Sequence, residues 1–322
     1  MSLQLGYSGL INLGNTCYLN STLQILSHIS LLNEYLKQNT TYNDSIDKLL
    51  TIEWLSLYNL MWSQNCTISP NRFIHYVKEI SREKNSILNI NEQNDATEYF
   101  YFVIDTIHNS LNNVYNLNLQ KTNNIEINKS IDNYEKNNKS IIHYLFTSFI
   151  MNRYTNQDTD LNEFDKIEPS FTIELSIPQL NNIHLNDCFE HTFKSENLND
   201  LWFDDKTQQQ KKIKKRSYLC YLPEILVIHL KRWEHDLNKN NSIIKFEDTL
   251  NVHNFTIGLQ PNDCNYELFG IINHTGNIFG GHYFSYIKKN NKWFIFDDAT
   301  INHINYSIVS DKNYCLFYKK IN

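Results

Sequence analysis

The sequence lacks closely spaced cysteine pairs. Its six cysteines are scattered over the chain, at positions 17, 66, 188, 220, 264 and 315, and no Cys-X-X-Cys occurs. Paired spacing is the usual signature of a structural zinc site or of a redox dithiol, so neither is indicated. Scattered cysteines are typical of reduced thiols, and we expect a protein of the cytoplasm, the nucleus or both.

The sequence also lacks a long hydrophobic run and an excess of basic residues. No stretch approaches the length of a membrane-spanning helix, and residues 1–13 have neither the basic start nor the apolar stretch of a signal peptide. We therefore expect a soluble protein with no membrane partner. The formal net charge of −6 argues against a nucleic-acid partner, because such proteins usually present a basic surface. It suits a basic protein partner better.

Hydrophobic residues are abundant and their period changes along the chain. They make up 41% of the residues, enough for a substantial core in one large domain or two ordinary ones. They recur at helical spacing in the first third, and from about Tyr144 the period becomes two. Residues 171–177 alternate, and residues 225–230 form a continuous apolar run that suits a central strand. The pattern predicts a helical first third followed by largely antiparallel β structure.

Two polar segments interrupt this pattern. Residues 123–140 are low in complexity and show no period, which predicts a mobile or disordered surface insertion. Residues 211–216 are basic, and we interpret them as a solvated strand or loop that protects a sheet edge. A nuclear localisation signal is the alternative interpretation of the basic run.

The segment 9–26 places a cysteine where a loop becomes a helix. Its first half is a turn rich in Gly and Asn, and its second half has apolar residues at helical spacing, with Cys17 at the junction. Asn15 or Thr16 can cap the first turn, and the free N–H groups of that turn favour an anion such as a thiolate. The alternative is a small apolar cysteine buried in a helix.

A second motif near the other end of the chain predicts a hairpin that carries a histidine and an aspartate. A glycine pair precedes His282, and a second aromatic strand runs into Asp297 and Asp298. If residues 290–291 form a two-residue loop, Asp297 lies on the same face as His282 and Asp298 points away. An odd loop or a bulge would reverse this assignment. A histidine with a carboxylate behind it suits a general base whose ring is oriented by a third group.

Both motifs resemble sequence boxes of the ubiquitin-specific proteases. Residues 9–26 resemble the cysteine box of that family, and residues 280–283 with 293–299 resemble its histidine box. Weaker matches follow the family order at residues 92–100, 222–233 and 314–318. The resemblance spans nearly the whole chain and includes two long, specific motifs.

The resemblance implies an α+β fold of the papain-like cysteine protease class, built as a single catalytic domain. Residues 1–120 would form a helical thumb and residues 121–140 a polar insertion. Residues 141–220 would form β fingers, and residues 221–322 an antiparallel β palm. Many members of the family hold a structural zinc in the fingers with two cysteine pairs. The corresponding stretches here contain no cysteine, so we predict that this zinc is absent and that no metal or cofactor is required.

The resemblance also implies catalytic roles. Cys17 would attack the carbonyl carbon of the C-terminal glycine of ubiquitin, His282 would act as base and then acid, and Asp297 would orient the imidazole. The side-chain amide of Asn12 would form the oxyanion hole together with the backbone N–H of Cys17. From the residues alone, Asn12 is a turn residue that bonds its own backbone.

Further residues are implied to bind the ubiquitin tail. Asp95 and Glu98, with Gln93 nearby, would grip basic side chains of the tail, whereas from the residues alone they stabilise a helix N-terminus. The loop from His274 to Gly281 would cover a narrow channel for the two terminal glycines.

Tyr283 and Asp298 would contribute to the same channel or to hydrogen bonds behind the catalytic residues. The implied partners are ubiquitin and ubiquitinated proteins, and we expect a monomer. Two other interpretations stay open, namely an inactive ubiquitin-binding protein with the same fold and a protease for another ubiquitin-like modifier. The joint presence of cysteine, histidine and aspartate favours an enzyme, and the acidic pair favours ubiquitin.

Overall fold

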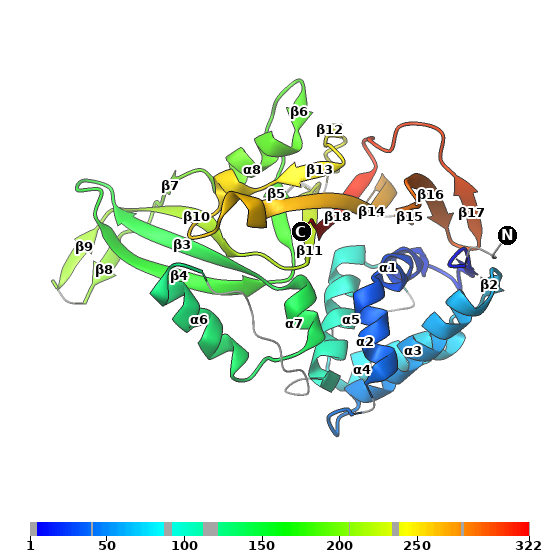
Figure 1. The fold of residues 1–322 in the computed structure, drawn as a ribbon. Coiled ribbons are helices and arrows are strands. Elements are labelled where there is room, and N and C mark those ends of the chain that lie inside the picture. The colour runs from blue at the N-terminus through cyan, green and yellow to red at the C-terminus, as the bar shows by residue number, and fades with distance from the viewer. Residues whose placement is uncertain are drawn as a thin grey trace.

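The computed structural model describes residues 5–39, 41–86, 92–111, 122–205, 207–233, 238–277 and 280–321. A group of helices packs against one face of a large sheet, and a second, elongated sheet extends away from both (Figure 1). Among the described residues, no helix has both the length and the apolar character needed to cross a membrane.

The helical part confirms the predicted helical first third. Its helices are α1 (Cys17–Ser27), α2 (Ser30–Gln38), α3 (Asp47–Ser63), α4 (Asn71–Glu83) and α5 (Ala96–Leu111). Helix α5 packs against α1 and α3, and its apolar stripe is fully buried because apolar residues three and four apart share one face. Trp54 of α3 is buried in the same core and donates a hydrogen bond from Nε1 to Asn33 Oδ1 (3.0 Å).

The large sheet has the strand order β17-β16-β15-β14-β18-β11-β5, and β13 also pairs with β14. The bounds are β5 (Ile173–Ser176), β11 (Ile225–Lys231), β13 (Thr249–Asn251), β14 (Asn265–Asn277), β15 (Gly280–Lys289), β16 (Lys292–Asp297), β17 (Thr300–His303) and β18 (Asn313–Lys320). All neighbours are antiparallel except β5 and β11, so the prediction of largely antiparallel structure is confirmed.

The continuous apolar run of β11 has a simple cause. Val227 points into the core shared with the helices, whereas Leu226 and Ile228 point into a second core on the other face. Helix α8 (Leu185–Phe193) covers that second face together with the 3-10 turns η1 (His253–Phe255) and η2 (Pro261–Cys264). A strand that is buried on both faces needs a nearly continuous apolar sequence, which in β11 is interrupted by the half-buried His229.

The second sheet forms the finger-like extension, with the strand order β4-β3-β10-β7. Its strands are β3 (Ser148–Asn156), β4 (Asn162–Ser170), β7 (Glu196–Asn197) and β10 (Ile213–Tyr221). Short pairs elsewhere are β1 (Gly9–Leu10) with β2 (Thr67–Ile68), β6 (Ile183–His184) with β12 (Ile244–Lys245), and β8 (Trp202–Asp204) with β9 (Gln209–Lys211). Within the predicted finger range 141–220, however, α7 (Ile141–Phe146) packs on α5 and β5 joins the large sheet, so this range is too broad.

The polar segment 123–140 is not disordered, and the prediction for it is wrong. It contains helix α6 (Ile125–Glu135), whose N-terminus is capped by the side chain of Asn124. Ile127 and Ile131 lie four residues apart and are buried in a small core with residues of β3 and β10. One buried edge is enough to hold a polar helix once a sheet surface is available to receive it.

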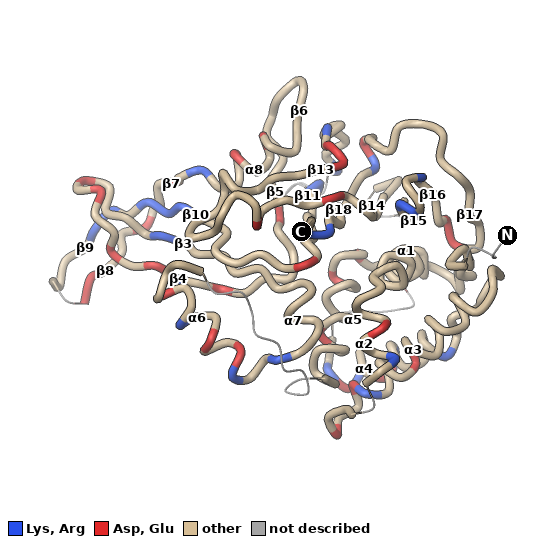
Figure 2. Tube along the Cα trace, viewed as in Figure 1, with Lys and Arg blue, Asp and Glu red and all other residues tan. Residues whose placement is uncertain are grey.

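The basic run 211–216 forms part of β9 and β10, as the strand interpretation predicted. Basic and acidic segments lie near one another in the fingers (Figure 2). Lys211 Nζ lies 2.9 Å from a carboxylate oxygen of Glu163 and 2.8 Å from one of Asp204, and Lys214 pairs with Asp160. Ion pairs and an aromatic stack of Tyr154 on Phe164 therefore join the strands of the fingers. The predicted absence of zinc stays a prediction.

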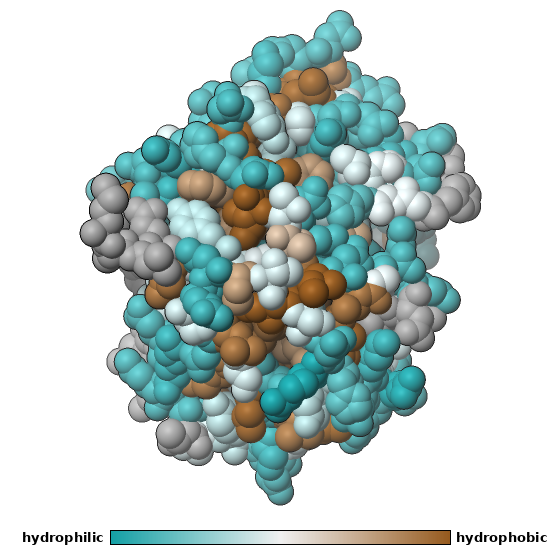
Figure 3. Space-filling model, turned by 90° about the vertical axis from the view of Figure 1, so that its right-hand side faces the viewer, coloured by the Kyte–Doolittle hydropathy of each residue, from teal (hydrophilic) through white to brown (hydrophobic). Residues whose placement is uncertain are grey.

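Seen from the end that carries β17 and the N-terminus, apolar side chains gather in a central zone between hydrophilic upper and lower regions (Figure 3). The upper region belongs to the sheets and the lower region to the helices. The candidate catalytic residues come from both parts, with Cys17 on a helix and His282 and Asp297 on strands. Their geometry therefore depends on how the helices pack against the sheet.

The buried edge of α6 leads to a stability prediction. Ile131→Ala is expected to lower the free energy of unfolding by about 2–4 kcal/mol, because it leaves a cavity beneath the helix. Ile125→Ala is the matched control on the same helix, since Ile125 is 71% exposed, and should change it by less than about 0.5 kcal/mol. Urea denaturation followed by circular dichroism measures both values. Equal effects of the two substitutions would contradict burial of Ile131.

Candidate active site

Cys17 is the first residue of α1, and its side chain is only 4% exposed. The predicted capping by Asn15 or Thr16 is wrong, because no side chain caps this helix. The Thr16 hydroxyl instead donates to Asn12 Oδ1 (3.2 Å) and accepts from the backbone N–H of Leu13 (2.9 Å). These hydrogen bonds stabilise the loop before the helix. The side chain of Thr16 therefore does not occupy the N–H groups of the first turn, where Cys17 lies.

The hairpin has the predicted register. Asn290 and Asn291 form its two-residue loop with φ values of 49° and 58°, the left-handed conformation that a tight hairpin turn requires. Residue 289 pairs with 292 and residue 287 pairs with 294, and the ladder continues to residues 285 and 296. Continued beyond this ladder, the register places Asp297 of β16 diagonally across from His282 of β15, with Nε2 and Oδ1 2.5 Å apart. Asp297, rather than Asp298, is the carboxylate that faces the histidine.

The imidazole of His282 also contacts Cys17. Its pKa is raised to about 9, first by a hydrogen bond with Cys17 and then by Asp297, against the opposing effect of burial. A histidine with a raised pKa is protonated below that value, so the ring carries a positive charge at neutral pH. Because Nε2 is engaged by Asp297, Nδ1 is the nitrogen left for the sulfur. The thiol of Cys17, the imidazole of His282 and the carboxylate of Asp297 thus lie in series, with the imidazole in contact with both other groups.

Hydrogen bonds of Asp298 join the β15–β16 hairpin to the loop and helix on either side of Cys17. Its carboxylate accepts hydrogen bonds from Asn12 Nδ2 (2.9 Å) and Asn20 Nδ2 (2.7 Å), and its backbone carbonyl accepts one from the N–H of Leu10 (2.9 Å). The two chain segments touch so closely that a Cβ on Gly9 would lie 2.4 Å from the carbonyl oxygen of residue 299. Asp298 therefore lies behind Cys17, His282 and Asp297, the candidate catalytic residues.

Asn12 and Asn20 differ in how well the sequence indicated them. Asn12 Oδ1 accepts from the backbone N–H groups of Gly14 and Thr16, both at 3.1 Å, as the interpretation from the residues alone predicted. Its implied role in the oxyanion hole stays a prediction. Asn20 was missed, although it lies three residues after Cys17 and therefore on the same side of α1.

His282, Asp297 and Asp298 bring ligand atoms within 4.8 Å of one another, a grouping that can hold a metal ion. Their atoms, however, already have protein partners. His282 Nε2 pairs with Asp297, and the two carboxylate oxygens of Asp298 accept from two different amides. The arrangement is that of a hydrogen-bonded relay, in which each group has its partner without an ion.

A cavity of about 460 Å³ lies between the start of α5 and strands of the large sheet, and we call it the tail channel. Five of the predicted substrate-binding residues line it, namely Gln93, Asp95, Glu98, His274 and Tyr283. Other lining residues that the sequence did not indicate include Glu174, His229 and Trp233, which come from β5, from β11 and from the residues just after β11. Their hydrophobic or alternating sequence context gave no sign of a site.

Both carboxylate oxygens of Asp95 accept hydrogen bonds from other groups of the protein. Oδ1 accepts from the backbone N–H groups of Thr97 (2.7 Å) and Glu98 (3.2 Å), and Oδ2 accepts from the hydroxyl of Tyr314. Glu98 is exposed beside it, and burial first and the charge of Asp95 second raise the pKa of Glu98. The interpretation as a helix-terminus residue thus accounts for Asp95, and Glu98 is the carboxylate directed outward.

The described residues of the predicted loop 274–281 are paired strand, since β14 and β15 continue through Asn277 and Gly280. Gln93 bridges the channel to Gly281 at the start of β15. Its Oε1 accepts from the backbone N–H of Gly281 (2.9 Å), and its Nε2 donates to the carbonyl oxygen of Gly281 (3.3 Å). A Cβ on Gly281 would lie 2.1 Å from His274 Nε2, so only glycine fits there. Burial lowers the pKa of His274 to about 4, and its neutral ring packs on Tyr283 with 4.5 Å between ring centroids. His274 thereby shapes this segment.

Comparison with known proteins agrees with this geometry. The family model described as ubiquitin carboxyl-terminal hydrolase matches residues 8–318. The chain belongs to this family. Members of the ubiquitin carboxyl-terminal hydrolase family are cysteine-type deubiquitinases, and the predicted resemblance is confirmed.

Individual members of the hydrolase family match over the whole chain. Ubiquitin carboxyl-terminal hydrolase Usp2 of Drosophila melanogaster is 28% identical over 98% of this chain, and ubiquitin carboxyl-terminal hydrolase 8 of Saccharomyces cerevisiae is 28% identical over 97%. The chain spans 35% of the length of the first relative and 70% of the second.

Solved structures of the family confirm the fold. A SAGA DUB module of Ubp8, Sgf11, Sus1 and Sgf73 bound to monoubiquitin matches with a TM-score of 0.79 and 26% identity, over 100% of this chain and 71% of that one. The same module bound to ubiquitin aldehyde matches with a TM-score of 0.78, at 25% identity and over the same shares of the two chains. The α+β fold of this hydrolase family is therefore established, whereas the expectation of a monomer stays a prediction.

The contact between His282 and Cys17 predicts how the imidazole titrates. In Cys17→Ala the pKa of His282 should fall from about 9 toward its ordinary value, because the hydrogen bond with the sulfur is the largest cause of the shift. Asp297→Asn should lower the pKa by a smaller amount. Histidine ring resonances followed by NMR between pH 5 and 10 would measure it. An unchanged pKa in Cys17→Ala would contradict the contact.

Proposed function

We propose that this protein hydrolyses the bond that follows the C-terminal glycine of ubiquitin. The observation that carries the proposal is the convergence of Cys17, His282 and Asp297, which lie on a helix and two strands, at one point of a hydrolase-family fold. Relatives named as ubiquitin carboxyl-terminal hydrolases and a neighbour solved with ubiquitin aldehyde support the substrate.

In the proposed reaction His282 takes the proton of the Cys17 thiol, which gives an imidazolium beside a thiolate. The sulfur attacks the carbonyl carbon, and the C–N bond breaks as His282 gives its proton to the leaving amine. Water then attacks the thioester carbonyl and gives a proton to His282, the C–S bond breaks, and the Cys17 sulfur and the free C-terminal carboxylate of ubiquitin are released. Asp297 holds the ring through Nε2 and stabilises its charge, which keeps Nδ1 directed at the sulfur during both steps.

The oxyanion of the tetrahedral intermediate requires donors that are fixed beforehand. The backbone N–H of Cys17 is one candidate, since the first turn of α1 leaves its N–H groups without intrahelical partners. Asn12 Nδ2 is the other, because only one of its two N–H groups is needed for Asp298. Through that bond Asp298 would hold the amide still, which is the condition for effective stabilisation of the oxyanion.

Ubiquitin has a tail with basic residues before its two terminal glycines, and the tail channel suits it. The glycines would pass beside the bridge between Gln93 and Gly281, where the ring of His274 and the backbone approach so closely that Gly281 itself has no room for a Cβ. Glu98 and Glu174 would accept the basic side chains further out, in place of the internally bonded Asp95.

A ubiquitin electrophile tests the proposal. Ubiquitin with a C-terminal electrophile should form a covalent adduct with the wild-type protein and with Cys66→Ala, and none with Cys17→Ala, as measured by intact-protein mass spectrometry. Cys66 is a matched control because it is a partly exposed free thiol elsewhere in the chain. Binding without an adduct in the wild type would favour the inactive receptor, and reaction only with another modifier would favour a different protease.

The fastening role of Asp298 gives a kinetic prediction. Asp298→Ala should lower kcat/KM for a fluorogenic ubiquitin amide by about 100-fold, because a misplacement of reacting groups by about 1 Å has this effect. The alkylation rate of Cys17 by iodoacetamide should change in parallel. Asp158→Ala, which removes an exposed carboxylate in the fingers, is the control and should behave as wild type. Activity that is undiminished in Asp298→Ala would contradict the role.

A further inference from the structure

Lys289 is the last residue of β15 and takes no part in the proposed chemistry. It lies just before the turn of the hairpin that carries His282 and Asp297. Its ammonium group donates hydrogen bonds to the backbone carbonyl oxygens of Leu5 (2.7 Å) and Gly6 (2.8 Å), the first described residues of the chain. The tip of the β15–β16 hairpin is therefore joined to the N-terminal segment.

Aromatic rings enclose the same ammonium group. Lys289 Nζ lies 3.9 Å from the ring centroid of Tyr7 and 4.9 Å from that of Trp62 on α3. Both distances are in the range at which a ring face attracts a cation. The fit is tight, because a Cβ on Gly6 would lie 2.6 Å from Nζ and 2.8 Å from the Trp62 ring. We call the two carbonyl oxygens, of Leu5 and Gly6, and the two rings the lysine clasp.

The lysine clasp holds its cation without a carboxylate. In the described ranges no acidic side chain forms an ion pair with Lys289, and the titratable groups near it are Tyr7, His28 and its cross-strand partner Lys292. Burial lowers the pKa of Lys289 to about 8. Burial first and the charge of Lys289 second lower the pKa of His28 to about 4, and burial raises the pKa of Tyr7. Lys289 therefore carries the charge in the clasp at neutral pH.

The lysine clasp also contacts the C-terminal end of α1. His28, which follows α1, has its Nε2 3.3 Å from the carbonyl oxygen of Gly6, the same oxygen that accepts from Lys289. The ring of His28 lies 5.3 Å from that of Trp62 and 5.3 Å from that of Phe296 on β16, measured between centroids. The end of α1, the clasp and the hairpin thus form one packed group.

Helix α1 is consequently joined to the hairpin at both of its ends. Beside Cys17 the contact is made by Asp298, and at the far end it is made by Lys289. His282 and Lys289 are seven residues apart on β15, so the clasp acts about 24 Å from the histidine. A second contact at that distance restricts the tilt of the hairpin on α1, which is the motion that would separate His282 from Cys17.

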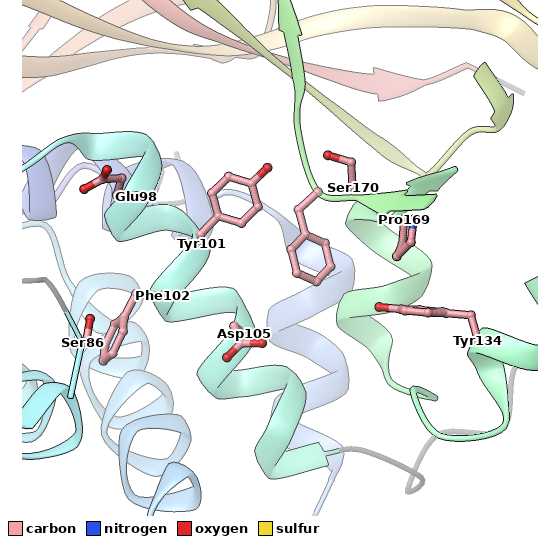
Figure 4. Close-up of a pocket in the computed structure, with 9 residues that line it drawn as sticks. Ser86, Glu98, Tyr101, Phe102, Asp105, Tyr134, Pro169 and Ser170 are labelled. Atoms are coloured by element: carbon pink, nitrogen blue, oxygen red, sulfur yellow. The ribbon is translucent and has the colours of Figure 1, made fainter. Parts of the chain in front are cut away.

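The lysine clasp lies apart from the cavities near the active site. One cavity is the tail channel, and a second, of about 560 Å³, lies where α5 faces the end of β4 and Tyr134 of α6 (Figure 4). Neither Lys289 nor residues 5–7 are among the described residues that line these two cavities. A change in the clasp should therefore alter the chemical steps and leave the binding of a tail unchanged.

We propose that Lys289 is a positioning residue, whose ammonium group fixes the tilt of the β15–β16 hairpin on α1 and so holds His282 against Cys17. This inference rests on the proposed function and adds to it a contact that is distant from the reacting atoms. Groups that react with each other must be held within a fraction of an ångström, and a restraint at each end of α1 meets that requirement.

The substitution Lys289→Met keeps the apolar stem and removes the charge and both hydrogen bonds. It should lower kcat for a fluorogenic ubiquitin amide about tenfold and leave KM within about twofold, because even a small displacement of reacting groups slows the reaction. Lys288→Met is the matched control. Lys288 is the adjacent, likewise half-buried residue, but it pairs with Asp248 and Glu267, so its loss should change kcat by less than about twofold.

The pH profile separates positioning from a general loss of stability. The wild-type kcat/KM should decline as the pH rises through about 8, because the ammonium group of Lys289 becomes a neutral amine and loses its attraction to the rings. In Lys289→Arg the guanidinium stays charged, so the decline should begin only near pH 9, where His282 loses its proton. Identical alkaline limbs in the wild type and Lys289→Arg would contradict the proposal. If Lys289→Met does not fold, these two profiles decide alone.

The pKa of His282 reports the same positioning without hydrolysis. In Lys289→Met it should fall below the wild-type value of about 9, because contact with Cys17 is the largest cause of that value, whereas Lys288→Met should keep it. Histidine ring resonances followed by NMR across the titration measure the pKa in all three proteins.

The outcomes separate this inference from the proposed function. If the wild type hydrolyses ubiquitin amide and Lys289→Met matches Lys288→Met in kcat and in the pKa of His282, the positioning proposal is wrong and the hydrolase proposal stands. If the wild type does not hydrolyse but the pKa of His282 falls in Lys289→Met alone, positioning is supported and the hydrolase proposal fails. Absence of both hydrolysis and the fall in pKa overturns both.

Discussion

The catalytic geometry depends on the attachment of the β15–β16 hairpin to the amino end of α1. Cys17 belongs to a helix and His282 to a sheet, so nothing in the local chain holds them together. The contact is made by Asp298, which binds Asn12 before the cysteine and Asn20 after it, while the hairpin backbone accepts from the loop. A relay of three groups works only when each is held within a fraction of an ångström, and these bonds supply that rigidity.

The sequence was a good guide wherever function follows from local pattern. The two-residue loop of the hairpin fixes the parity of both strands, so the choice of Asp297 over Asp298 as partner of His282 could be made from residue counting alone. The position of Cys17 at a helix start followed in the same way from a turn-rich stretch and helical spacing. Both inferences use only interactions between residues near one another in the chain.

The sequence was a poor guide where contacts between distant elements decide. Asn20 has its role only because Asp298 arrives from the other end of the chain. The stretch 123–140 appeared too polar to fold, yet β3 and β10 offer a surface for Ile127 and Ile131 that no local pattern reveals. Likewise, the hydroxyl of Tyr314 donates a hydrogen bond to Asp95. A carboxylate that the resemblance assigns to substrate binding therefore already has a partner within the protein.

These observations bear on how such a site gains specificity. In the proposed reaction the two terminal glycines offer no side chains to bind. Binding energy for such a tail must therefore come from groups further from the scissile bond. Helix α5 can provide it, because Gln93 just before the helix touches the catalytic hairpin and the exposed Glu98 lies one turn further on.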